Sequence, residues 1–211
     1  MTGCTKDTTL IIGLTGGIAS GKSTAAQLLG SWGAHVIDAD KLGHSAYLAG
    51  TQAFDQVVTT FGSHVVGEDG EIDRGKLGAE VFGKGNRLDE LTAIVWPAIR
   101  NMAQAEFARV QAAHVDPVIV LEAAVLLEAG WQDLVDEIWV VVVEPDIAIQ
   151  RATARDGVDA QAIQDRLDAQ LSNDERRSAA DRVIDNSQGP TELEATLRTL
   201  WQNIQGAAHD S

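Results

Sequence analysis

Short apolar runs alternate with stretches of helical periodicity along this chain. The runs are typical of buried strands, and they fall at residues 10–14, 35–40, 118–121, 138–143 and 183–184. The run at 138–143 is apolar throughout, which indicates a strand covered by helices on both faces. The alternation predicts an α/β fold with a five-stranded parallel sheet flanked by helices.

Helices are predicted between these strands. Residues 21–32 form an amphipathic pattern directly after a glycine-rich turn. A longer helix is expected to begin near Leu88 and to break at Pro97, because proline lacks the backbone donor that a helix interior needs. The last helix is expected to open on a capping box at Thr191, and residues 206–211 are expected to fray. Further helical segments are predicted at about 50–61, 74–82 and 146–180.

Composition and charge restrict the possible partners. The 211 residues carry 16 basic and 31 acidic side chains, so the formal charge is −15. A surface this acidic repels phosphate backbones and anionic lipids, so neither nucleic acid nor a membrane is expected as a partner. Residues 1–9 lack the pattern of a secretory or transit signal, and the single cysteine, Cys4, excludes a disulfide framework. A reducing, cytoplasmic location is therefore expected, while the oligomeric state is not indicated.

A phosphate-loop motif follows the first predicted strand. Residues 16–23 match G-x-x-x-x-G-K-[ST], with a strand before them and a helix after them. Glycines let successive backbone N–H groups surround a phosphate, and the helix N-terminus adds its positive dipole end. Lys22 is expected to reach the β- and γ-phosphates of ATP, and Ser23 to offer its hydroxyl to Mg²⁺. The alternative, a glycine turn with a surface lysine, is disfavoured because spacing, strand and helix agree. The predicted nucleotide-binding residues are Gly17, Ile18, Ala19, Ser20, Gly21, Lys22, Ser23 and Thr24.

Carboxylates lie at the ends of two predicted strands. Asp38 and Asp40 end the second strand, where alternation would place both side chains on one side of the sheet. The carboxyl ends of parallel strands share an edge with the phosphate loop, so Asp40 is a candidate general base for an acceptor hydroxyl. The alternative is that both aspartates cap the next helix. Glu122 ends the third strand, where it would hold Mg²⁺ through water or hydrogen-bond a loop.

Arginine is concentrated in one late segment. Six of the 16 basic residues lie between 151 and 182, and all six are arginine. Arg151 and Arg155 are four positions apart and could face one polyphosphate, with planar forks that suit phosphate oxygens. The segment would then be a mobile lid that excludes water. Seven acidic residues in the same span leave a salt-bridged helical surface as the alternative.

An ordered set of further motifs makes the chain resemble the dephospho-coenzyme A kinase family over nearly its whole length. The phosphate loop alone is common to very many proteins, whereas the ordered set is much more specific. Its members are the segments 36–40, 70–74, 126–128, 166–170 and 180–186.

The resemblance implies a P-loop nucleoside triphosphate hydrolase-like fold of the nucleotide-kinase type, with a helical substrate region and a lid. It implies transfer of the γ-phosphoryl group of ATP to the ribose 3′-hydroxyl of dephospho-CoA, the last step of coenzyme A synthesis. The implied parts of this single domain are a core at about 8–45, 116–150 and 181–205, a substrate-binding region at about 46–115 and a lid at about 151–180.

The resemblance also implies roles for individual residues. Asp40 would face the acceptor hydroxyl, Arg151 or Arg155 would be the lid arginine, and Asn186 would belong to the adenine pocket. Together with the strand-end carboxylates, the predicted contacts to the acceptor substrate are Thr15, Asp38, Asp40, Trp96 and Glu122.

Two positions depart from the pattern of many bacterial members. Trp96 stands where histidine is common, so an indole that can stack but offers one donor replaces an imidazole. This position, with segments 41–44 and 127–131, instead resembles the kinase domain of the eukaryotic bifunctional coenzyme A synthase. Ala19 replaces a common glycine, a mild change if its φ is negative.

Two rival functions follow from the same loop. Another small-molecule kinase, acting on a nucleoside, nucleotide or sugar acid, would share the fold and differ in its acceptor. A GTP-binding switch is disfavoured because the D-x-x-G at Asp40 follows Lys22 too soon to leave room for a switch segment and a strand. No apolar strand precedes the near match to N-K-x-D at residues 86–89.

Overall fold

The structure is a computed structural model that describes residues 9–209, so the prediction about Cys4 lies outside the described residues. The chain divides into two compact units, which are described separately here. The first, called the sheet unit, contains Met1–Ile37 and Phe107–Ser211. The second, called the helical unit, contains Asp38–Glu106. No helix among the described residues is both long enough and apolar enough to cross a membrane.

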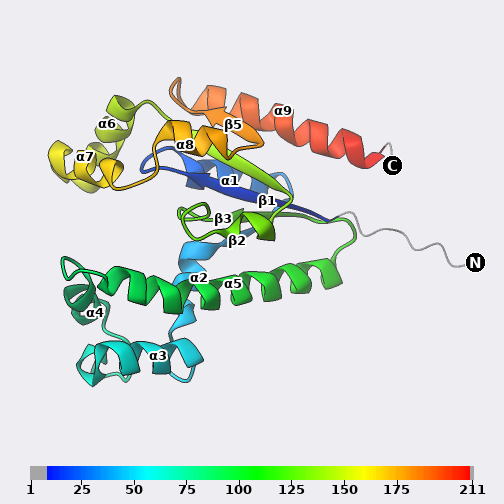
Figure 1. The fold of residues 1–211 in the computed structure, drawn as a ribbon. Coiled ribbons are helices and arrows are strands. Elements are labelled where there is room, and N and C mark those ends of the chain that lie inside the picture. The colour runs from blue at the N-terminus through cyan, green and yellow to red at the C-terminus, as the bar shows by residue number, and fades with distance from the viewer. Residues whose placement is uncertain (1–8, 210–211) are drawn as a thin grey trace, which may run out of the picture. The chain divides into compact units, whose positions relative to one another are not determined.

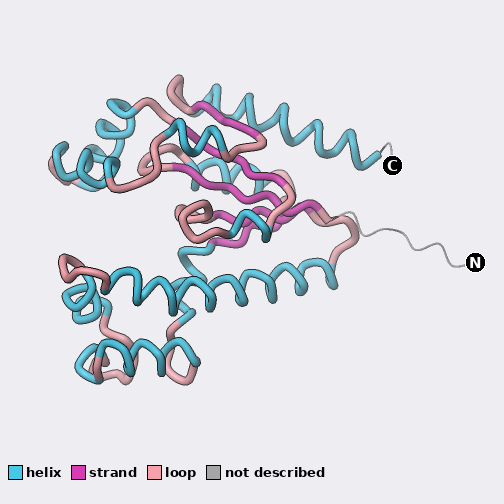
Figure 2. Tube along the Cα trace, in the orientation of Figure 1, coloured by secondary structure: helices cyan, strands magenta, loops and turns pink. Residues whose placement is uncertain are grey.

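A five-stranded sheet organises the sheet unit (Figures 1 and 2). The strands occur in the order β2-β3-β1-β4-β5, and β1 pairs in parallel with both β3 and β4. The register sets Leu14 beside Glu122 and Gly16 beside Val141, so the carboxyl ends of the central strands meet at one edge. This arrangement confirms the predicted parallel sheet. The strands are β1 Leu10–Gly16, β2 His35–Asp38, β3 Val118–Glu122, β4 Glu137–Val142 and β5 Arg182–Asp185.

The first and last helices build the main core with the sheet. Helix α1 (Lys22–Ser31) and helix α9 (Pro190–His209) contact each other and bury apolar side chains against the strands. Trp139 is buried in this cluster, in agreement with the prediction that the apolar run at 138–143 is a covered strand. The cluster therefore holds α1, and with it the loop that precedes α1, firmly on the sheet.

Three helices connect β4 to β5. They are α6 (Pro145–Asp156), α7 (Ala160–Asp168) and α8 (Asn173–Ser178). Proline opens α6, where its missing donor costs nothing, and Gly157 closes the helix with φ +66°. Helix α8 starts on a complete capping box, in which the Ser172 side chain accepts from the Glu175 backbone and the Glu175 side chain accepts from the Ser172 backbone.

The helical unit has its own small core. The elements are α2 (Ala39–Ala46), α3 (Gln52–Phe61), the short 3₁₀ helix η1 (Ser63–Val65), α4 (Arg74–Val81) and the first part of α5 (Arg87–Ala113). Helices α3 and α4 begin on side-chain caps from Thr51 and Asp73. The buried core residues are Val57, Phe61, Val65, Ile72, Leu77 and Val81.

Three boundaries differ from the sequence predictions. Helix α5 continues through Pro97, because Pro97 is exposed and buried side chains such as Ile99 and Phe107 follow it. Packing here outweighs the roughly 3 kcal/mol that an interior proline costs. Helix α9 begins at Pro190 rather than after Thr191, since the Leu193 N–H already donates to the Gly189 carbonyl. The same helix extends to His209, so the expectation that residues 206–209 fray was wrong, and residues 210–211 lie outside the described residues.

Candidate active site

The loop between β1 and α1 has the backbone shape of an anion site. A Cβ at Gly16 would lie 2.5 Å from both Ser20 Oγ and the Val141 carbonyl, and one at Gly21 would lie 2.2 Å from Asn186 Nδ2. Gly21 also has φ +97°, so both glycines are required. Helix α1 has neither a side-chain cap nor an acidic residue in its first turn. Its positive N-terminal dipole end is therefore left for an anion.

Ala19 adopts a conformation that the sequence did not suggest. Its φ is +54°, in the left-handed region. The condition under which alanine would be a mild replacement for glycine, a negative φ, is therefore not met. Left-handed backbone costs an L-residue about 1 kcal/mol, so the loop carries strain at this position.

Lys22, Ser23 and Glu122 form one cluster beside the loop. The Lys22 Nζ and the Ser23 Oγ each lie 2.7 Å from the same carboxylate oxygen, Glu122 Oε1. The side chains of Lys22 and Glu122 are only 11% and 9% exposed. Glu122 thus contacts both predicted phosphate-loop ligands, Lys22 and Ser23, across 100 and 99 positions of sequence. The set offers a cation for phosphate, together with a hydroxyl and a carboxylate oxygen of the kind that Mg²⁺ prefers.

Asn186 ties the loop after β5 to the phosphate loop. Its buried side chain donates from Nδ2 to the Ser20 carbonyl at 2.7 Å, and the Asn186 backbone carbonyl accepts from Arg151 Nη2 at 2.9 Å. The residue predicted for the adenine pocket therefore connects α6 to the phosphate loop.

The two candidate lid arginines have different surroundings. Arg151 bonds Asn186, whereas Arg155 forms two bonds of 2.7 and 2.8 Å with Asp156 and is 64% exposed. The hydrogen bond to Arg155 lowers the pKa of the Asp156 carboxyl. In this structure Arg155 matches the salt-bridged surface alternative, and the two guanidinium groups bond different partners, Asn186 and Asp156.

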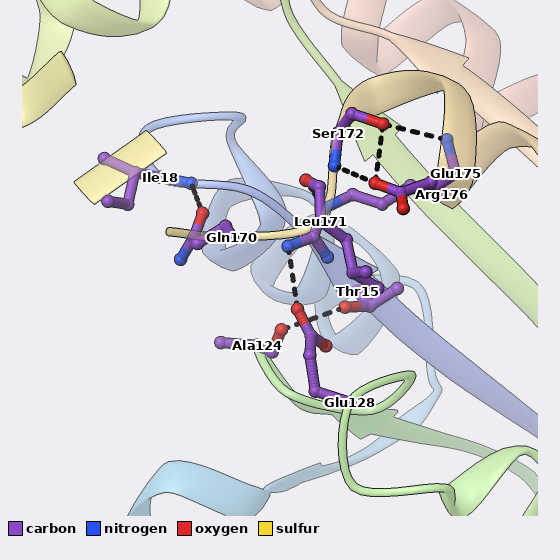
Figure 3. Close-up of polar contacts among 9 residues, drawn as sticks. All are labelled: Thr15, Ile18, Ala124, Glu128, Gln170, Leu171, Ser172, Glu175 and Arg176. Atoms are coloured by element: carbon purple, nitrogen blue, oxygen red, sulfur yellow. Dashed lines mark hydrogen bonds and ion pairs between the residues drawn. The ribbon is translucent and has the colours of Figure 1, made fainter. Parts of the chain in front are cut away.

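Sequence reasoning missed three polar residues near the loop (Figure 3). Gln170 Oε1 accepts from the Ile18 backbone N–H at 3.1 Å. Arg176, on α8, is buried and donates from Nη2 to Glu128 at 3.1 Å. Gln170 and Glu128 lie in segments that carried the family resemblance, and that was their only signal. Arg176 had none, because it is one of six arginines in a strongly charged stretch.

Gln170 and Arg176 line a cavity of about 450 Å³ within the sheet unit. The phosphate loop supplies one part of its lining, and the segment from α7 to α8 supplies another. The residues that line it include Gly17, Ile18, Ser20, Gln170, Glu175 and Arg176.

The remaining predicted site residues are Asp38, Asp40, Trp96 and Thr15. Strand β2 ends at Asp38, and Asp38 caps α2 by accepting from the Lys41 N–H at 3.1 Å. Burial opposes ionisation of Asp38, but hydrogen bonds from the Lys41 backbone and side chain outweigh it and lower its pKa. Asp40 lies in the first turn of α2, so the prediction that both aspartates share one side of a strand was wrong. Trp96 is half-buried in α5. Thr15 is fully buried, and its hydroxyl lies 3.4 Å from the Ala124 carbonyl.

The strand order and the loop between β1 and α1 define a P-loop kinase fold. A shikimate kinase from Bacteroides thetaiotaomicron shares this fold, with a TM-score of 0.52 at 15% identity over 93% of this chain and 98% of that chain.

Among P-loop kinases, this chain is most specifically similar to the dephospho-CoA kinases. The family model for dephospho-CoA kinases matches residues 10–192. A dephospho-CoA kinase from Geobacter sulfurreducens is 44% identical over 191 residues, covering 90% of this chain and 96% of that protein. A crystal structure from Thermus thermophilus has a TM-score of 0.76 at 33% identity, covering 92% of this chain and 97% of that chain. The chain therefore belongs to the dephospho-CoA kinase family, whose activity is the ATP-dependent phosphorylation of dephospho-CoA in coenzyme A biosynthesis.

Proposed function

We propose that this chain transfers the γ-phosphoryl group of ATP to the ribose 3′-hydroxyl of dephospho-CoA, giving coenzyme A and ADP. The observation that supports this proposal most directly is the cluster of Lys22, Ser23 and Glu122 beside the phosphate loop. A lysine held at the N-terminus of a helix with a side chain only 11% exposed is suited to the β- and γ-phosphates of a nucleotide.

In this proposal the β- and γ-phosphates of ATP lie against the backbone of residues 17–24. The uncapped start of α1 and Lys22 supply positive charge at this place. Such a local positive site is necessary because the protein as a whole, with a charge of −15, repels phosphate. The Asn186 side chain holds the loop by donating to the Ser20 carbonyl, and Arg151 holds Asn186 by donating to its backbone carbonyl. Arg155 would have to break its ion pair with Asp156 to contact ATP. We therefore propose Arg151, rather than Arg155, as the lid arginine.

Ser23 and Glu122 would hold Mg²⁺ together with the nucleotide phosphates. Their hydroxyl and carboxylate oxygens suit a small, hard cation, which usually takes one or two protein ligands beside phosphate oxygens. When bound, the ion would supply neutralisation of negative charge on the β- and γ-phosphates.

Asp40 is the proposed general base. It would accept the proton of the 3′-hydroxyl as the bond from that oxygen to the γ-phosphorus forms and the bond to the β,γ-bridging oxygen breaks, releasing ADP. Its support is its place two residues after the last residue of β2, in the first turn of α2. Thr15, Asp38 and Trp96 are proposed to contact the acceptor, Trp96 by stacking.

An ADP-release assay across candidate acceptors tests the proposal. Dephospho-CoA should be turned over far faster than adenosine, nucleoside monophosphates or gluconate, and ATP should be preferred over GTP. A clear preference for one of the other acceptors would refute the substrate assignment and leave the kinase class intact. We also propose a cytoplasmic location and no nucleic-acid partner, on the basis of the acidic surface.

A further inference from the structure

Arg176 is an unusual buried cation in the sheet unit. Its side chain is 1% exposed, although a guanidinium stays charged under all ordinary conditions. Among the described residues with buried polar or charged side chains it is the one basic member; the others are Thr15, Ser20, Glu122 and Asn186. A buried charge is retained at a cost in stability, so its partners need to be accounted for.

The partners of Arg176 leave one nitrogen unmet. Nε donates to the Leu171 carbonyl at 3.2 Å, and Nη2 donates to Glu128 Oε1 at 3.1 Å. Nη1 is buried and has no hydrogen-bond partner in the structure. Buried donors are normally satisfied, so an unmet donor on a fixed cation indicates an acceptor that arrives with a ligand.

The cavity identifies the chemistry of that ligand. Arg176 and the phosphate-loop residues Gly17, Ile18 and Ser20 line the same cavity of about 450 Å³. A guanidinium on one part of a cavity and a phosphate loop on another favour a phosphate group between them. The planar fork of arginine can bind two oxygens of such a group.

We propose that Arg176 is a catalytic residue whose Nη1 donates to the γ-phosphoryl group of ATP. This inference rests on the proposed binding of ATP at the phosphate loop. The fixed cation stabilises the charge that is spread over the phosphoryl oxygens during transfer, and no rearrangement is needed at that moment.

Glu128 is the matching positioning residue. It holds the guanidinium through Nη2, and the Leu171 carbonyl holds Nε, so the plane of the group is set from two sides (Figure 3). The capping box of Ser172 and Glu175 orders the first turn of α8, from which Arg176 projects. The free nitrogen is thereby preorganised rather than mobile.

Four variants test this assignment: Arg176→Gln, Arg176→Lys, Glu128→Gln and the control Arg177→Gln. Arg177 is the next residue on α8, is 39% exposed and lies 3.4 Å from Asp185, so it matches Arg176 in type and helix but not in burial. The measurements are kcat and KM on dephospho-CoA, the affinities for ADP and for a non-hydrolysable ATP analogue, and the melting temperature.

Arg176→Gln should lower kcat at least about 100-fold, the scale for losing one preorganised donor. The affinity for the ATP analogue should fall about tenfold, since one charge-assisted hydrogen bond is lost, while the affinity for ADP changes less than about twofold. Arg176→Lys keeps the charge without the fork and should lower kcat about tenfold, as should Glu128→Gln. Arg177→Gln should stay within about threefold of the wild type.

Two results would overturn the assignment. One is a folded Arg176→Gln variant with kcat within threefold of the wild type. The other is an equal loss of ADP and analogue affinity in Arg176→Lys, accompanied by a lower melting temperature, which would mean that Arg176 only supports the fold. If Arg176→Gln does not fold, the kinetic constants, affinities and melting temperatures of Arg176→Lys and Glu128→Gln test the assignment in its place. A wild type inactive on dephospho-CoA would refute the substrate assignment alone, because the comparison of ADP with the analogue needs no acceptor.

Discussion

The two units of this protein contain predicted site residues of two different kinds. In the sheet unit, direct hydrogen bonds connect distant parts of the chain: Lys22 bonds Glu122, and Asn186 bonds the Ser20 carbonyl of the phosphate loop. In the helical unit, Asp38 uses its carboxylate to cap α2, and Asp40 follows in the first turn of that helix. The residues proposed to bind the nucleotide are thus placed by long-range contacts on the sheet, whereas Asp38 and Asp40, which are proposed to contact the acceptor, are placed by the start of one helix. We expect substitutions in the sheet unit to impair every substrate of the reaction, and those in the helical unit to affect the acceptor selectively.

The largest effect is expected at Lys22. Lys22→Ala should lower turnover by at least about 1,000-fold, because it removes the cation that neutralises the transferring phosphoryl group. The check is ADP release with dephospho-CoA, with Lys84→Ala, an exposed lysine of the helical unit, as the control. Activity close to that of the wild type would show that the loop does not hold ATP.

Asp40→Asn is the variant for which turnover and ATP affinity should differ most. We expect kcat to fall about 100- to 10,000-fold, the range for loss of a general base, while ATP affinity stays unchanged. Asp89→Asn is the matched control, since Asp89 is an exposed acid in the first turn of another helix of the same unit. If Asp40→Asn weakened ATP binding as much as turnover, Asp40 would belong with the nucleotide and the contrast between the units would fail.

Trp96→Ala tests whether the helical unit contacts the acceptor. Losing an aromatic stacking contact of about 1 kcal/mol should raise the KM for dephospho-CoA several-fold to tenfold and leave the KM for ATP unchanged. Steady-state kinetics with each substrate varied in turn provides the measurement. Equal changes in both KM values would indicate a general packing role for Trp96.

The stability of Asp38 variants tests whether this residue acts only as the cap of α2. Asp38→Ala removes the cap of α2 and should cost about 1 kcal/mol of unfolding free energy, whereas Asp38→Asn keeps a cap and should cost little. Because its pKa is lowered in the folded protein, the ionised Asp38 contributes stability above about pH 4 that is lost as the pH falls through the folded pKa. Urea unfolding of both variants measures the cap. An asparagine variant that is stable but inactive would give Asp38 a role beyond capping.

The smallest effect is expected at His35, in the sheet unit. Burial, then the nearby His114 and Arg109, lower the pKa of His35, so the unfolded chain binds its proton at a higher pH than the folded one. Stability should therefore fall slightly as the pH drops below about 6.5. Urea unfolding at pH 7.5 and 5.5 should show this fall, and His35→Gln should reduce it. If the unfolding free energy of His35→Gln fell between pH 7.5 and 5.5 as much as that of the wild type, the pH dependence would belong to other groups.

Much of the scaffold was predictable because its signals are local. The strand, the glycine turn and the amphipathic helix at residues 10–31 lie next to one another in sequence, and each constrains the others. Predictions failed where packing competed with a local rule. Helix α5 passes Pro97 because its buried residues continue beyond that position, and Ala19 takes a positive φ because the loop requires it.

The sequence by itself determined the fold class, the phosphate loop and the family, since these depend on residue types at fixed spacings. Only the tertiary structure decided that one carboxylate oxygen of Glu122 accepts from both Lys22 and Ser23, and that Asn186 supports the phosphate loop. The same is true of Arg176, which is buried beside that loop with one donor unmet. These contacts join residues separated by up to 166 positions. They depend on strand register and on the packing of helices, which no local pattern of side chains specifies.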